Sequence, residues 1–183
     1  MIRSTSFCIL FALTLMMAPM SFAQQPTDCM TNPRFADFDF WLGSWQVTPF
    51  AGGEKSGDNV ISRVEGGCAV EEHWTSVNGS TGRSLNYFNP VTGKWRQIWV
   101  SAGAYSIDIE GGLEGGIMSL EGSIFYYAGA AGPNATALPF RGEWTPQPDG
   151  TVRQRFEQYD PEAGAWTVWF DGLYTRSLMP AEQ

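Results

Sequence analysis

Histidine is nearly absent from this sequence, which has a single one, His73, among 183 residues. A catalytic triad needs an imidazole beside an activated serine, and no G-x-S-x-G sequence is present to supply one. Zinc-type sites need several Cys or His ligands at set spacings, and neither CxxC nor HxxxH occurs. We therefore expect no metal, no cofactor and no nucleophilic triad.

Long hydrophobic runs are also scarce. The longest, Phe7 to Met20, is too short to cross about 30 Å of hydrocarbon as a helix. Arg3 precedes it, and Ser21-Phe22-Ala23 follows with small residues where a signal peptidase needs them. We predict a signal peptide over residues 1–23, cleavage before Gln24, a secreted or periplasmic location and no membrane span in the mature chain. Residues 24–183 have the usual length of one domain.

Positive charge is sparse as well, with 11 Lys and Arg against 19 Asp and Glu and a net charge of −8. Loss of Arg3 with the leader would bring the charge of the mature chain to −9. An acidic chain lacks the electrostatic footprint for nucleic acid, so we expect no such partner. The glycine-rich stretch 111–116 lacks the lysine of a phosphate-binding loop and is interpreted as a hairpin turn.

Only three cysteines occur, and Cys8 would leave with the signal peptide. Cys29 and Cys68 remain as an even pair in an oxidising compartment. We predict that they form one disulfide; two unrelated buried thiols are the alternative.

A short helical signal opens the mature chain. Asn32-Pro33 has the form of a helix start, with a side-chain cap and a ring preset for the first turn. Phe35, Phe38, Trp41 and Leu42 then recur at helical spacing, so we expect at most two apolar turns before Gly43.

Beyond Gly43 the pattern is that of an all-β protein. Segments rich in Val, Ile, Thr and aromatic residues alternate with Gly, Pro, Asn and Asp about every 8 to 12 residues, as in a sandwich or barrel. Since there are more than ten segments, some neighbours should be one bent strand. The expected strands are 44–49, 59–65, 69–77, 83–88, 94–101, 104–110, 116–121, 123–127, 140–145, 151–159, 165–170 and 172–177.

The turns favour a meander. Segments 89–95 and 160–166 each carry Asn or Asp, then Pro, then Gly three residues later, as in a hairpin. Pro148-Asp149-Gly150 marks another hairpin, so strands 140–145 and 151–159 should pair. Consecutive hairpins predict an antiparallel up-and-down sheet, and closure into a barrel would remove its edges. Segment 128–139, without charge, is expected to be a loop.

The apolar turn leading into Gly43-Ser44-Trp45 resembles the G-x-W opening of the lipocalins and their calycin relatives. Arg176 resembles the last-strand arginine that stacks on that tryptophan in those folds. The chain is also similar to a family of secreted bacterial proteins of unassigned function, in the strings Phe38-Asp39-Phe40-Trp41-Leu42-Gly43-Ser44-Trp45, Ser84-Leu85-Asn86, Gln97-Ile98-Trp99-Val100 and Phe170-Asp171-Gly172-Leu173-Tyr174.

This resemblance frames nearly the whole mature chain. It implies a calycin-like barrel of about 8–10 strands, with Trp45 and Arg176 in contact at its closed end; a two-sheet sandwich is the runner-up. Some related small barrels hold haem through a histidine near the C-terminus, which this chain lacks, so no haem is expected.

Strand alternation divides each segment between an inner and an outer face. In segment 94–101, burying the face of Gln97 and Trp99 avoids taking the charge of Arg96 out of water, so that face should point inward and Ile98 outward. Aromatic groups mixed with amides suit a ligand cavity, although they would equally fill a dry core. The residues expected to line a cavity are Trp74, Asn86, Gln97, Trp99, Trp144, Gln154 and Phe156.

Two groups of ionisable residues are weaker candidates for a catalytic role. Glu72 and Trp74 share one strand face and Glu71 and His73 the other, so only one of these pairs can point inward. Asp108 and Glu110 share a face and could flank a sugar bond, but solvated strand charges look the same.

Three functions remain open. The first is a barrel that binds a small, mainly apolar molecule; the second is an enzyme on that scaffold, such as an isomerase or hydratase using cavity amides and one carboxylate; the third is a filled barrel acting through its surface. A cavity would separate the first two from the third, and a buried ionisable group inside it would favour the enzyme. The sequence indicates no partner protein and no oligomeric state.

Overall fold

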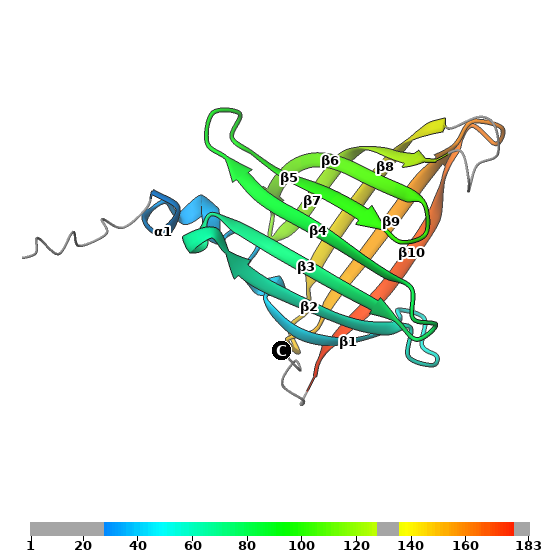
Figure 1. The fold of residues 1–183 in the computed structure, drawn as a ribbon, viewed down its shortest axis with the longest axis horizontal. Helices are drawn as coiled ribbons and strands as arrows, with labels where there is room; N and C mark the ends of the chain where they lie inside the picture. The colour runs from blue at the N-terminus through cyan, green and yellow to red at the C-terminus, as the bar shows by residue number, and fades with distance from the viewer. Residues whose placement is uncertain (1–27, 128–135, 178–183) are drawn as a thin grey trace, which may run out of the picture.

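The computed structural model describes residues 28–127 and 136–177, which form an all-β closed barrel of ten antiparallel strands (Figure 1). The order around the barrel is β1-β10-β9-β8-β7-β6-β5-β4-β3-β2, so each strand pairs with its sequence neighbours and β1 closes on β10. The barrel is confirmed and the sandwich is wrong, because closure pairs both edges of every strand in the described ranges. The expected signal peptide and its cleavage site lie outside the described residues.

The strand boundaries agree with most expected segments, and two pairs of expected segments prove to be one strand each. Segments 116–121 and 123–127 both belong to β7, and 165–170 and 172–177 both belong to β10. The strands are β1 (Gly43–Pro49), β2 (Gly57–Val64), β3 (Ala69–Ser76), β4 (Thr81–Asn89), β5 (Lys94–Ser101), β6 (Tyr105–Glu114), β7 (Ile117–Tyr126), β8 (Thr136–Pro146), β9 (Val152–Asp160) and β10 (Ala165–Arg176).

One expected loop is partly wrong. β8 begins at Thr136, so residues 136–139 are strand, where segment 128–139 was expected to lack regular structure. β7 extends to Tyr126, which pairs with Thr136 of β8. This pairing gives hydrogen-bond partners to backbone groups of a segment whose composition alone indicated a loop. Residues 128–135 lie outside the described part of the chain.

The two similar turns adopt the same geometry. Asn89 Oδ1 accepts a hydrogen bond from the backbone N–H of Val91 at 3.0 Å, and Asp160 Oδ1 accepts one from Glu162 at 2.8 Å. Gly93 and Gly164 close the turns at φ of +70° and +64°, where a residue with a Cβ would be strained. The hairpin nature of both segments is confirmed.

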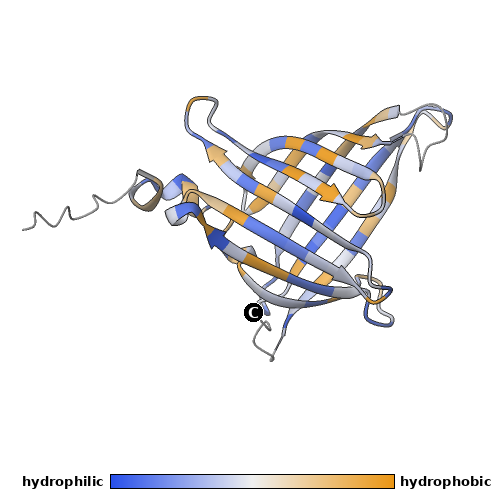
Figure 2. Cartoon of the chain, viewed as in Figure 1, coloured by the Kyte–Doolittle hydropathy of each residue, from blue (hydrophilic) through white to orange (hydrophobic). Residues whose placement is uncertain are grey.

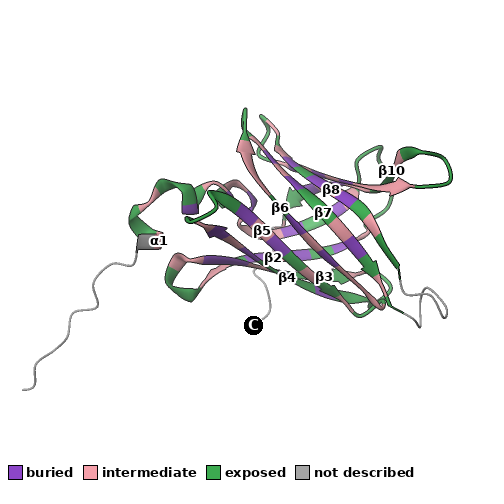
Figure 3. Cartoon of the chain, turned by 90° about the horizontal axis from the view of Figure 1, so that it is seen from above, coloured by how far each residue is buried: buried purple, intermediate pink, exposed green. Residues whose placement is uncertain are grey.

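Alternation along the strands separates a core face from a solvent face, visible as alternating colours in Figure 2. In β5 the side chain of Arg96 is 42% exposed, while Gln97 is 1% exposed, which confirms the expected orientation. Ile98 and Val100 are exposed on the outer wall, as this orientation requires. Figure 3 shows buried residues concentrated on the strands and exposed ones at the connecting turns.

The N-terminal segment closes one end of the barrel. It forms a short helix α1 (Asp28–Thr31) and two 3₁₀ turns, η1 (Pro33–Ala36) and η2 (Asp39–Trp41), which agrees with the expected short helical segment before Gly43. Asn32 caps η1 by accepting the N–H of Arg34 at 3.0 Å, as expected. Phe38 is fully buried, with its ring 5.5 Å from that of Trp95 and 5.2 Å from that of Trp144. We call residues 33–41 the plug.

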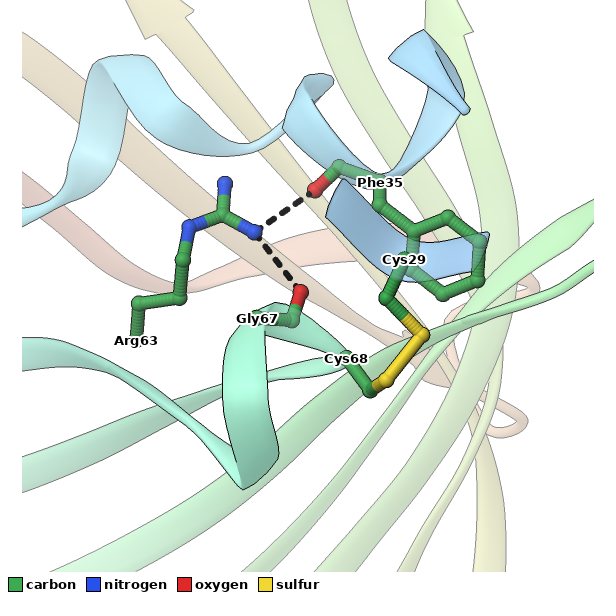
Figure 4. Close-up of a disulfide and its surroundings, with 5 residues drawn as sticks. All are labelled: Cys29, Phe35, Arg63, Gly67 and Cys68. Carbon is green, nitrogen blue, oxygen red and sulfur yellow. Dashed lines mark hydrogen bonds between the residues drawn. A yellow bond between two sulfur atoms is a disulfide. The ribbon is translucent and has the colours of Figure 1, made fainter. Parts of the chain in front are cut away.

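Two kinds of link fasten this end to the sheet (Figure 4). Cys29 and Cys68 are disulfide-bonded, as predicted, which joins α1 to the residue that follows η3 (Glu65–Gly67) between β2 and β3. Arg63 Nη1 donates to the carbonyls of Phe35 at 3.2 Å and Gly67 at 2.9 Å. Among the described residues, no helix is both long and apolar enough to cross a membrane.

Candidate ligand cavity

A cavity of about 120 Å³ lies inside the barrel, at the end opposite the plug. β5 shows the arrangement: Trp95, at its start, contacts Phe38 of the plug, whereas Trp99, near its end, lines the cavity. Several lining side chains keep partial exposure, so the cavity opens toward solvent at that end. Its lining consists of Glu72, Trp74, Trp99, Tyr105, Ile107, Gln154, Phe156, Trp169, Phe170 and Tyr174.

The walls are predominantly aromatic, and their rings stand at steep angles to one another. The rings of Tyr105 and Trp169 lie 5.4 Å apart at 72°, and those of Trp74 and Phe170 lie 6.4 Å apart at 79°. Phe156 lies between them, 6.3 Å from Trp169 and 6.2 Å from Phe170. Such edge-to-face pairs fix ring positions, so the walls are largely preformed.

A bulge in β10 brings two consecutive side chains into this wall. Val168 pairs with Glu157 and Phe170 with Phe156, which leaves Trp169 as an extra residue opposite no partner in the ladder. In a regular strand Trp169 and Phe170 would point to opposite faces. The bulge turns both toward the cavity, as bulges commonly do beside binding sites.

Glycines on neighbouring strands make room for the two indoles that line the β3 and β5 sides. A Cβ at Gly57 would lie 2.7 Å from ring atoms of Trp74, and one at Gly82 would lie 2.1 Å from Trp99 Cζ2. Each ring therefore packs directly against a glycine, in space that a side chain at that position would occupy. This arrangement keeps part of the barrel hollow.

Glu72, on β3, supplies a carboxyl group at the inner end of the cavity. It is 4% exposed, and its oxygens accept hydrogen bonds from Asn59 Nδ2 and Ser84 Oγ, both at 2.7 Å. Burial raises the pKa of Glu72 from its ordinary 4.5 to about 7, against the lowering effect of these two hydrogen bonds. The group is therefore close to half ionised at neutral pH.

Tyr174 and Gln154 extend the same set of hydrogen bonds across the barrel. Asn59 Nδ2 donates to the hydroxyl of Tyr174 at 3.2 Å, and that hydroxyl donates to Gln154 Oε1. The pKa of Tyr174 is raised well above its usual value, by burial and by the nearby charge of Glu72. The phenol therefore stays protonated and can donate.

No cation from the described residues balances Glu72 inside the barrel. Within that part of the chain, Glu72 is the only buried member of the charged residue types. On the strands beside β3, Arg83 pairs with Glu71 on the outer wall, and Arg63 bonds to Phe35 and Asp39 of the plug. Arg96 forms a two-bond pair with Asp108 on the outer wall, and Arg153 forms one with Asp171. A lone carboxyl in an aromatic interior is costly when ionised, which is the origin of its raised pKa.

The cavity gathers four of the seven expected lining residues: Trp74, Trp99, Gln154 and Phe156. The other three, Asn86, Gln97 and Trp144, are buried in the barrel but do not line this cavity.

Asn86 and Gln97 are engaged with each other, since Gln97 Nε2 donates to Asn86 Oδ1 at 2.8 Å and Asn86 Nδ2 donates to Ser84 Oγ at 2.9 Å. Ser84 links these amides to the carboxyl of Glu72, because its hydroxyl also donates to Glu72. Trp144 instead packs on Phe38 of the plug, with its ring also 5.2 Å from that of Phe156.

The weaker candidates for catalysis lie on the outer wall. His73 is exposed, because Glu72 and Trp74 form the inward pair on β3. Asp108 pairs with Arg96, and Glu110 accepts a hydrogen bond from Lys94 at 2.5 Å, so neither carboxylate faces an enclosed space. No group of three metal-ligating side chains occurs within residues 28–127 and 136–177.

Sequence patterns missed six lining residues. In the sequence, Glu72 stood out only because it lies two residues before Trp74 and so shares its strand face. A charged residue is normally assigned to the solvent face. Trp169 was hidden by the bulge, which reverses the alternation rule. The missed residues are Glu72, Tyr105, Ile107, Trp169, Phe170 and Tyr174.

Comparison with known proteins adds no functional assignment. No protein-family model matches the chain, and no curated protein matches it in sequence. The function therefore has to be inferred from the cavity itself.

Proposed function

We propose that the protein is a secreted, calycin-like barrel that binds a small, mainly apolar molecule inside its open end. The observation that carries this proposal is the aromatic cavity of about 120 Å³. A dry cavity of about 150 Å³ in a protein core is large enough for benzene, so a molecule with one six-membered ring is the expected size. The resemblance to lipocalins supports the same function.

A filled barrel acting only through its surface is less consistent with this interior. The plug end is filled, with Trp41, Trp95 and Trp144 at most 1% exposed. At the other end Gly57 and Gly82 hold two indoles against the sheet and keep them out of the centre. A protein with no ligand would gain stability from larger side chains there, because apolar burial contributes about 25 cal/mol per Å².

Native mass spectrometry of periplasmically expressed protein tests the proposal. A co-purifying molecule would appear as an added mass that is lost on denaturation. A titration with benzyl alcohol, followed by tryptophan fluorescence, should show saturable binding because Trp74, Trp99 and Trp169 line the cavity. Absence of an added mass together with no saturable fluorescence change would contradict it.

An enzyme on this scaffold is the second candidate, and Glu72 is the observation that favours it. A carboxyl with a pKa of about 7, hydrogen-bonded by Asn59 and Ser84, can accept and return a proton at neutral pH. The matching reaction class is proton transfer within a small cyclic carbonyl compound. Tyr105 also lines the cavity and could donate to a carbonyl oxygen, whereas the hydroxyl of Tyr174 already donates to Gln154.

A simple assay distinguishes the enzyme from the binding protein. 3-Cyclohexenone fits the expected size, and its conversion to the conjugated 2-isomer is followed by ultraviolet absorbance. An enzyme should accelerate the conversion in proportion to protein concentration, and Glu72→Gln should abolish the effect. Binding of the ketone without conversion would contradict the enzyme and leave binding as the remaining function.

A further inference from the structure

We infer that the cavity selects a small organic cation, an aryl or alkyl ammonium, held in an aromatic cage with the carboxylate of Glu72 as its counter-ion. This inference rests on the proposed binding function and adds the charge of the ligand to it. It is the ligand class that accounts for both features of the cavity, the aromatic walls and the lone carboxyl.

The surroundings of Glu72 supply hydrogen bonds but no positive charge. Asn59 and Ser84 each donate one hydrogen bond, and the described residues that line the cavity include no Lys, Arg or His. A neutral apolar ligand would leave only the protonated form of Glu72 free of the cost of burying charge, and an anion would increase the cost of the ionised form. An ammonium group in the cavity offsets that cost through direct ion pairing.

The walls suit a cation for a second, independent reason. Tyr105 and Trp169 stand at 72°, and Trp74 and Phe170 stand at 79°, so ring surfaces bound the space in several directions. A cation near the face of an indole or phenyl ring is attracted by its quadrupole, more strongly when water is excluded. Recognition of ammonium ligands by aromatic cages follows from this geometry.

The charge of the whole chain acts in the same direction. With a net charge of −8, the protein attracts cations and repels anions during encounter. The cavity size restricts this preference to molecules of about the size of one ring.

The pH dependence of binding should report Glu72. The side chains that contact it from β2 and β4, Asn59 and Ser84, do not titrate. Arg63, the charged residue of β2 on the same alternation as Asn59, is bonded to Phe35 and Asp39 of the plug. Tyr174 from β10 and Tyr105 from β6 are the titratable groups on the facing strands, and the pKa of each phenol is raised, so both stay neutral. Protonation of Glu72 below neutral pH should remove the counter-ion and weaken binding of a cation.

Three ligands of one shape and different charge test the inference: benzylamine, benzyl alcohol and benzoate. Affinities are measured by tryptophan fluorescence and calorimetry with the mature chain. At about pH 8 benzylamine should bind at least about tenfold more tightly than benzyl alcohol, since the cation–π and ionic contacts are desolvated, and benzoate should bind most weakly. At about pH 5.5 the advantage of benzylamine should shrink, while the affinity for benzyl alcohol stays the same.

Substitution of Glu72 is the second test of the inference. Glu72→Gln should remove the preference for benzylamine and retain binding of benzyl alcohol. Glu71→Gln is the matched control, because Glu71 is the adjacent carboxylate on the outer face, paired with Arg83 at 3.3 Å, and should leave every affinity unchanged. If the Glu72→Gln variant fails to fold, the pH series on the unchanged protein decides.

The outcomes separate the two proposals. Equal binding of benzylamine and benzyl alcohol at about pH 8 would overturn the inference and leave the binding function standing. Tighter binding of benzoate would overturn it as well. Failure of all three ligands to bind would contradict the proposed function, and the cation preference with it.

Discussion

Gly82 lies against the indole of Trp99, so close that a Cβ at residue 82 would stand 2.1 Å from Trp99 Cζ2. The two residues belong to neighbouring strands, β4 and β5, and the indole ring packs against the backbone of Gly82. Because the sheet closes the outer side, a larger residue at 82 can displace the indole only toward the cavity. The width of the cavity therefore depends on a residue that does not line it.

Gly82→Ala should narrow the cavity and weaken binding of benzyl alcohol by about tenfold, the usual effect of one methylene in a fitted pocket. Overpacking should also lower the free energy of unfolding by about 1 to 3 kcal/mol. Fluorescence titration and urea denaturation measure the two effects.

Gly112→Ala is the control for this substitution. Gly112 is also a strand glycine, but a Cβ there would have its nearest contact at 3.8 Å, with Arg34 Nη2. It should leave ligand affinity unchanged. Equal affinities for the two alanine variants would show that Trp99 does not shape the binding space.

Arg176 joins the last strand to the first. Its guanidinium lies 4.1 Å from the centre of the Trp45 ring, and Nη1 donates to the carbonyl of Leu42 at 2.6 Å. Because Arg176 is exposed, Arg176→Ala should cost about 1 kcal/mol in free energy of unfolding, measured by urea denaturation. Arg83→Ala, which removes an arginine 61% exposed on the outer wall, should cost measurably less; equal losses would contradict a specific role for the stack.

The Cys29–Cys68 disulfide closes a loop with a sequence separation of 39 and holds the N-terminal segment to the barrel. In the chain-entropy model a loop of this length is worth roughly 3 to 4 kcal/mol. The paired Cys29→Ser and Cys68→Ser variant should lose a stability of that order in urea denaturation.

Reducing agent should destabilise the unchanged protein by a similar amount and have no effect on the double variant. Alkylation of free thiols at both Cys29 and Cys68 in unreduced protein would contradict the assignment.

The raised pKa of Glu72 makes stability depend on pH. Since its folded pKa of about 7 exceeds its ordinary 4.5, the folded state binds the proton more tightly, so stability falls as pH rises from 4.5 and levels off above about 7. At 1.36 kcal/mol per pKa unit the loss is about 3 kcal/mol. Relative to the unchanged protein, Glu72→Gln should therefore gain about that much between about pH 4 and pH 8, as measured by urea denaturation; a constant difference would contradict the shifted pKa.

Local chemistry was enough to predict much of the barrel. Asn89 and Asp160 start turns, and Gly93 and Gly164 accept the positive φ that closes them, so these hairpins follow from a few adjacent residues. The inward direction of Gln97 follows from the cost of burying Arg96 in the opposite orientation. The prediction of the disulfide followed from the two cysteines outside the expected signal peptide and from the expectation of an oxidising compartment.

The cavity was predictable only in part, because its members are brought together from strands distant in sequence. Asn86, Gln97 and Gln154 look alike along the chain, yet only Gln154 lines the cavity, since the first two bond to each other across β4 and β5. Trp169 required the bulge opposite Phe156, an irregularity of pairing that alternation cannot indicate.

The sequence by itself determined most of the strands, the meander, the disulfide and the inward face of β5, because turn chemistry and side-chain alternation are local. Only the tertiary structure decided that Glu72 is buried without a cation from the described residues, since Asn59 from β2, Ser84 from β4 and Tyr174 from β10 meet around it only when the barrel closes. Closure removes water from that carboxyl and raises its pKa, which no pattern of neighbouring residues along the chain can supply.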